Sequence, residues 1–93
     1  MPLEVTPLPG YLLLGRTPDQ TVVLQSCPRF RVLDIACDYS CEYTPEDIMA
    51  QYPFLSLAEI HQAIAFYLGH RREIDAEIER LKARWQALAS RRG

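Results

Sequence analysis

Three cysteines and two histidines are the residues in this chain with the chemistry to bind zinc. They are Cys27, Cys37, Cys41, His61 and His70. A structural zinc site takes about four ligands, usually with closely spaced cysteines. Here two cysteines share a predicted helix, while the others are scattered along the chain. Because free cysteine commonly behaves as a small buried hydrophobe, we expect inert thiols, no metal and no cofactor.

Acidic residues near the C-terminus are a second group that could hold a cation. They have basic neighbours at three- or four-residue spacing on a predicted helix, which favours a solvated, ion-paired face. The acids are Glu73, Asp75, Glu77 and Glu79. The sequence contains no phosphate-binding glycine loop and no nucleophile motif. We therefore expect that the protein is not an enzyme.

Polar side chains at the start of another predicted helix could read DNA. Gln62 could pair with adenine through two hydrogen bonds, and His61 could reach a base or a phosphate, with Ser56 beside them. Phosphate contacts would come from arginines outside this helix, since guanidinium groups suit phosphate oxygens. The candidates are Arg29, Arg31, Arg71 and Arg72.

The charge distribution opposes this interpretation. The formal net charge is −2, and residues 1–70 have three basic and eight acidic residues, against seven and four in residues 71–93. No lysine or arginine occurs between Val32 and His70. Since phosphate neutralisation supplies most DNA affinity, electrostatics alone favours helices that only pack, with solvated polar side chains.

The N-terminal third contains short β-rich runs and turn residues. Residues 1–10 contain three prolines and one glycine, which predicts an irregular arm. Runs on either side of a Pro-Asp pair predict a hairpin over residues 11–26. Residues 27–32 could add a short extended piece.

Helical spacing begins at Val32 and continues to the end of the chain, with two clear start signals. Thr44 can cap a short helix that begins with a proline. That helix is expected to end before Pro53, which disfavours helical geometry at the preceding residue. Ser56 and Glu59 then form a capping box for the next helix.

A heptad-like seam of apolar residues follows, with gaps that alternate between four and three, and Arg71 fills the one missing place. It consists of Ile60, Ile64, Tyr67, Ile74, Ile78, Leu81, Trp85 and Leu88. Without a break at Gly69, the helix would be about 50 Å long, too long to pack wholly on so small a domain. We expect a homodimer or partner interface at Ile74, Ile78, Leu81, Arg84, Trp85 and Leu88. The alternative is an intrachain core formed after a bend at Gly69.

Four motifs resemble a known family. They are TPEDI at residues 44–48, YPFLS at 52–56, AIAFY at 63–67 and HRREID at 70–75. On these the chain is similar to the small bacterial proteins called domain of unknown function 433. Upstream, residues 27–32 keep only an Arg and a Val of the family pattern, and Glu42-Tyr43 replaces its usual glycine.

This resemblance implies a helix-turn-helix-like, homeodomain-like three-helix unit and a relationship to VapB-type antitoxins. Such antitoxins bind operator DNA as dimers and block a PIN-type ribonuclease toxin. We therefore expect a mainly α fold: a β-hairpin arm over residues 1–31, a helix-turn-helix-like domain over 32–70 and a helical extension over 71–93. The expected function is that of a DNA-binding, toxin-binding autoregulator. The alternative is a helical dimerisation module without DNA binding.

The sequence also predicts where the protein resides. The run YLLL at residues 11–14 is too short for a signal-peptide core or a membrane span. An odd number of cysteines favours reduced thiols, as in a cytoplasm.

Overall fold

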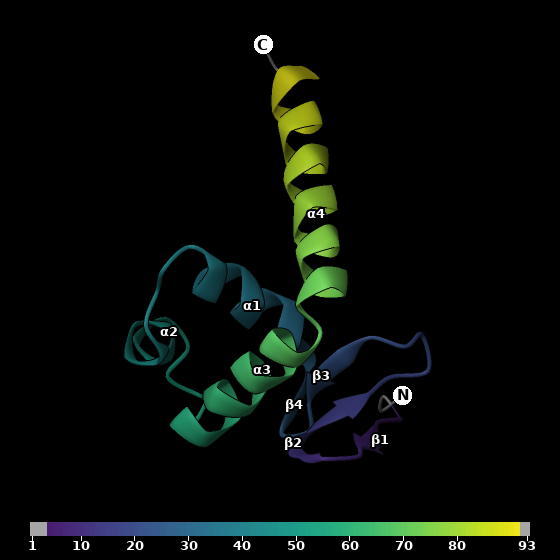
Figure 1. The fold of residues 1–93 in the computed structure, drawn as a ribbon, viewed down its shortest axis with the longest axis vertical. Helices are drawn as coiled ribbons and strands as arrows, with labels where there is room; N and C mark the ends of the chain where they lie inside the picture. Colours follow the sequence, from purple (N-terminus) through teal and green to yellow (C-terminus); the bar gives the residue numbers. More distant parts are fainter. Residues whose placement is uncertain (1–3, 92–93) are drawn as a thin grey trace.

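Four strands precede four helices in the computed structural model, which describes residues 4–91 (Figure 1). The strands are β1 (Thr6–Leu8), β2 (Tyr11–Arg16), β3 (Val22–Leu24) and β4 (Cys27–Arg31). The helices are α1 (Val32–Ser40), α2 (Pro45–Gln51), α3 (Leu57–Gly69) and α4 (Arg71–Arg91).

The strands form one antiparallel sheet in the order β1-β2-β3-β4. The expectation of a mainly α protein with only a short hairpin is therefore wrong, and the fold is α+β. The hairpin itself is present as β2 and β3. Its turn is closed by hydrogen bonds between Thr17 and Thr21, whose backbone N–H and C=O groups lie 2.9 Å apart. The additional strands, β1 and β4, flank this pair.

Strand β1 lies in the segment that its prolines had marked as irregular. Pro7 is tolerated because β1 is an edge strand, where a missing N–H group leaves no partner unpaired. Close approach to β2 depends on Gly15, since a Cβ atom there would lie 2.2 Å from Val5 Cγ1 and 3.0 Å from the Thr6 carbonyl oxygen. Pro9 and Gly10 form the two-residue turn that places Leu8 opposite Tyr11, so β1 and β2 are a second hairpin of consecutive strands. The same proline and glycine had been interpreted as signs of an irregular arm.

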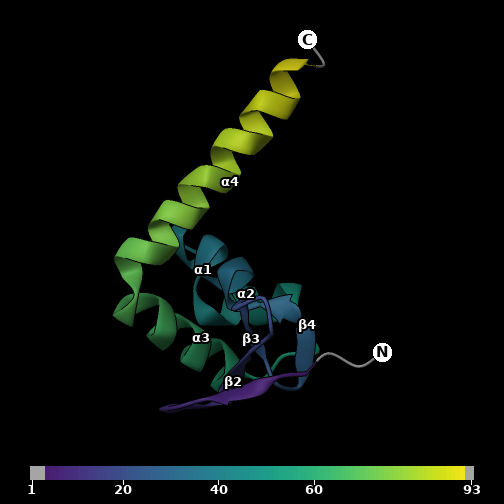
Figure 2. The same cartoon turned by 90° about the vertical axis from the view of Figure 1, so that its right-hand side faces the viewer.

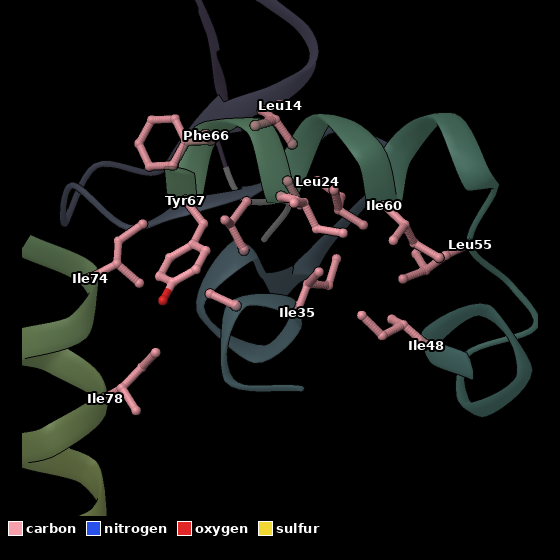
Figure 3. Packing of buried hydrophobic residues seen from close by; sticks show 14 residues of the cluster. Leu14, Leu24, Ile35, Ile48, Leu55, Ile60, Phe66, Tyr67, Ile74 and Ile78 are labelled. Atoms are coloured by element: carbon pink, nitrogen blue, oxygen red, sulfur yellow. The ribbon is translucent and has the colours of Figure 1, made fainter. Parts of the chain in front are cut away.

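The sheet contributes directly to the hydrophobic core beneath the helices. Leu14 of β2 and Leu24 of β3 are fully buried together with Ile35 of α1 and Ile60 of α3 (Figure 3). Helices α1, α2 and α3 therefore do not form a self-contained three-helix unit of the homeodomain type. They rest on a sheet that supplies part of their core.

The predicted helix starts are confirmed. Thr44 Oγ1 accepts a hydrogen bond from the Asp47 N–H at 3.1 Å, and the Asp47 carboxylate accepts one from the Thr44 N–H at 3.0 Å. Ser56 and Glu59 form the same reciprocal pair at the start of α3, at 3.2 and 2.9 Å. Both boxes satisfy N–H groups that the helix itself leaves without partners.

The chain leaves helical geometry at His70, where φ is −130° and ψ is 35°. This break separates α3 from α4, and the Tyr67 hydroxyl donates a 2.6 Å hydrogen bond to Asp75 across it. Ile74 and Ile78 then join the core (Figure 3). The remainder of α4 projects away from the other elements (Figures 1 and 2).

Gly15, at the contact between β1 and β2, and Gly69, at the end of α3, give a matched pair of variants. We expect Gly15→Ala to lower the free energy of unfolding by about 1–3 kcal/mol, because the added methyl group overpacks against β1. Gly69→Ala should be neutral or raise it by up to about 1 kcal/mol, since its Cβ meets only Tyr11 Oη, at 3.5 Å. Urea unfolding measures both, and equal effects would contradict the proposed role of Gly15.

Candidate functional site

The residues predicted for the C-terminal interface separate into two groups. Ile74 and Ile78 are only 9% and 3% exposed, so this part of the seam is intrachain core. Leu81 is half-buried, whereas Trp85 is 71% and Leu88 54% exposed. The sequence predicted one continuous surface, but its first part is already covered. The available part is the face of α4 from Leu81 onwards.

Charge also differs between the two parts of α4. Residues 71–79 have two basic and four acidic side chains, while residues 80–90 have three basic and none acidic. The basic residues are Arg80, Lys82 and the predicted interface residue Arg84, all exposed. The projecting end of α4 is therefore apolar along one face and basic beside it.

A groove runs along the side of α4 where it leaves the other elements. One hollow of about 230 Å³ is lined by two leucines, Leu33 of α1 and Leu81 of α4, and by four charged residues, Arg31, Glu77, Arg80 and Arg84. A second hollow, of about 380 Å³, shares Leu33 and Glu77 with the first and extends to Phe66. The two hollows therefore adjoin at the start of α1, but the second lies largely against the turn between β2 and β3.

The α3 side chains predicted to read DNA are mostly engaged elsewhere. Gln62 Oε1 accepts a 2.8 Å hydrogen bond from the Leu13 N–H group, which attaches α3 to β2 and occupies the acceptor that adenine would need. Among the described residues, the exposed positions along α3 are Ala58, His61, Ala65, Leu68 and Gly69. His61 is the only polar side chain in that strip, so little is available to contact base edges.

Glu59 is likewise part of the structure rather than of an open surface. Its carboxylate is buried and accepts hydrogen bonds from the Ser56 N–H and hydroxyl groups and from the Ser26 hydroxyl. Burial raises the pKa of Glu59, but the hydrogen bonds from Ser26 and Ser56 outweigh it and hold the pKa below its ordinary value. Glu59 joins the start of α3 to the turn between β3 and β4.

The predicted phosphate-binding arginines are not equally available. Arg31 pairs with Asp34 at 3.1 Å, and Arg71 pairs with Asp75 at 3.6 Å while its guanidinium lies 5.9 Å from the centre of the Tyr67 ring. Arg29 and Arg72 are exposed and form no ion pair within residues 4–91. Arg29 is on β4 and Arg72 on α4, so no single helix presents both.

The cysteines are free thiols, and burial raises the pKa of the Cys37 thiol, which disfavours its reactive thiolate form. In the described part of the chain, no three His, Cys, Asp or Glu side chains group closely enough to hold a metal ion. None of the helices there is both long and apolar enough to cross a bilayer.

Two features of this region were not predicted. Leu33 lies outside the buried stripe of α1, and an apolar residue at such a position is the signal that could have identified the groove. Asp75 was assigned to a solvated face, yet it accepts the hydrogen bond from Tyr67 that connects α3 to α4.

The lowered pKa of Glu59 gives a pH-dependent prediction. Because the folded pKa is depressed, the contribution to stability is full above the ordinary glutamate pKa of about 4.3 and is lost as the pH falls from there through the lower folded pKa. We expect Glu59→Gln to cost about 1–3 kcal/mol at pH 7 and much less in acid. Urea unfolding across pH measures this, with Glu46→Gln, at an exposed first-turn position, as control. A cost that does not change with pH would contradict the role of the charge.

Comparison with known proteins gives one match. Residues 28–67 match the family described as "Protein of unknown function (DUF433)". No curated protein and no solved structure matches the chain. The match extends from β4 to α3 and confirms the resemblance over that range, while a relationship to VapB-type antitoxins stays a prediction. From β4 to α3, the chain is similar to a family of unknown function.

Proposed function

We propose that this protein is an interaction module that forms a homodimer through the projecting part of α4. The observation that carries this proposal is the exposure of Trp85 and Leu88 on a helix beyond its last buried residue, Ile78. Together with Leu81, these side chains recur at three- and four-residue spacing and so share one face. Arg84 lies at the edge of that face.

Physical considerations favour a partner for this face. A helix end with no tertiary contacts gains little stability, because most helical stability in proteins comes from packing an apolar face. Large exposed apolar side chains grouped on one surface commonly mark interaction sites. Tryptophan and arginine are also the residues most often found at the energetic centre of interfaces. A second copy offers the same apolar face to pack against.

Trp85 is both the proposed anchor and the only tryptophan in the chain, so its fluorescence reports directly on the interface. We expect its emission to shift to shorter wavelength as protein concentration rises, in parallel with a dimer in sedimentation. Trp85→Ala should weaken the dimer about tenfold or more, because it removes a buried aromatic anchor. Gln86→Ala, one residue away and off the seam, is the control. A Trp85→Ala variant that sediments like the wild type would rule out this interface.

A DNA-binding autoregulator of the antitoxin type, with a PIN-type toxin as partner, is a second candidate. The observation in its favour is that two capped helices, α2 and α3, follow one another across a short turn at residues 52–56. In addition, Arg29 on β4 and Arg72 on α4 are exposed. The engaged Gln62 and the nearly apolar strip of α3 oppose it. On this candidate, cationic side chains outside α3 supply the affinity.

Titration of DNA from upstream of the protein's own gene tests this candidate. If it holds, binding at about 50 mM salt should weaken steeply as salt rises, and the Arg29→Gln and Arg72→Gln variants should each lower the salt slope by about 1. Glu79→Gln serves as a control for surface substitution. Absence of binding at the lower salt concentration would exclude it and leave the interaction module.

A further inference from the structure

We propose that the two α4 helices of the homodimer run antiparallel, with Leu88 of one copy in the hollow lined by Leu33 and Leu81 of the other. This inference rests on the proposed homodimer and adds its geometry. The overlap would extend over about residues 78–88, which is about 16 Å of helix. So short an interface is at the low end of the range for specific complexes and predicts a concentration-dependent dimer.

The position of α1 decides the direction of the partner helix. The seam of α4 is a single face, and its first half, Ile74 and Ile78, is already covered by the chain's own core, with α1 beside it. A parallel partner in register would need to place its own residues 71–79, and the elements packed on them, where α1 lies. An antiparallel partner overlaps only the half of α4 that projects from the other elements (Figure 2), so its own remaining elements would lie beyond the end of α4.

The spacing of the seam sets the register of the antiparallel pair. Alternating gaps of four and three place Trp85 of one helix opposite Leu81 of the other, and the reverse, in two equivalent layers. The next layer outward brings Leu88 to the level of Ile78 of the partner. Ile78 is buried there, but the 230 Å³ hollow that begins at the preceding residue, Glu77, contains Leu33 and Leu81 among four charged side chains. Each end of the overlap thus places a leucine in a groove.

Charged residues flanking the seam distinguish the two directions. In an antiparallel pair, flanking positions meet their own counterparts, so Lys82 faces Lys82 and Arg84 faces Arg84 of the second copy. In a parallel pair, Lys82 would instead face Glu77 of the second copy. The antiparallel dimer therefore contains like-charge contacts that salt screens, whereas the parallel dimer would contain attractive ones that salt weakens.

Neutralising Lys82 tests the direction in the full-length chain. We expect Lys82→Gln, and added salt, to strengthen the dimer, with about a twofold lower dissociation constant for the variant, because one like-charge contact is removed. Glu79→Gln, which lies off the seam, should change nothing. Weakening of the dimer by Lys82→Gln would overturn the antiparallel arrangement.

Disulfide cross-linking tests the register independently. In a chain with Cys27→Ala, Cys37→Ala and Cys41→Ser, mild oxidation of the Arg84→Cys variant should yield a covalent dimer. The Leu88→Cys variant should not, because its counterpart lies about 15 Å away along the axis. The reverse pattern, or no cross-link at either position in a sample that sediments as a dimer, would overturn the proposed geometry alone. A chain that sediments as a monomer at every concentration would instead overturn the homodimer itself.

Discussion

Helix α3 has to bury side chains on two sides at once, and most of the structure depends on this. One side packs on the sheet, with Gln62 bonded to Leu13, and the other packs on α1. Its buried residues are Glu59, Ile60, Ala63, Ile64, Phe66 and Tyr67. What remains for solvent is a narrow strip in which His61 is the only polar side chain. A helix that is central to a core this small has little surface left for reading bases.

The packing of α3 also determines the direction in which α4 leaves the other elements. Tyr67, at the end of α3, packs in the core and donates its hydroxyl to Asp75, while Ile74 and Ile78 extend the core across the break at His70. These contacts act within the first two turns of α4 and fix its direction. From Lys82 to Ser90 every side chain of α4 is exposed, and Trp85 and Leu88 are among them although they continue the same seam.

How much of this was predictable depended on the range of the interactions. The starts of α2 and α3 were predictable because Thr44 and Ser56 find their partners three residues away. Strand β1 was not predicted, because its prolines and Gly10 were interpreted as an irregular arm, although Pro9 and Gly10 form the tight turn that pairs Leu8 with Tyr11. The role of Gln62 in joining α3 to β2 was missed, and Glu59 was identified only as a helix cap. Gln62 bonds a residue 49 positions away and Glu59 one 33 positions away, and no local pattern reports such a pair.

The apolar seam also shows what a local sequence pattern leaves undecided. Its spacing is uniform from Ile74 to Leu88, so the pattern alone gives no reason to divide it after Ile78. The division falls after Ile78 because the hydrophobic core, where α1 contacts α4, ends at that residue, a property of tertiary packing. Periodicity thus identified which residues share a face, and only the fold decides which of them remain available to a partner.

The family match is consistent with this division of roles. Residues 28–67 include both capping boxes, most of the helical core and the Phe30–Tyr52 contact, with ring centres 4.7 Å apart. These positions maintain the fold, and a fold by itself does not specify a function. Trp85, Leu88 and the basic side chains beside them lie outside the match. If α4 is the site of interaction, proteins that share residues 28–67 can share this scaffold and still differ in what they bind.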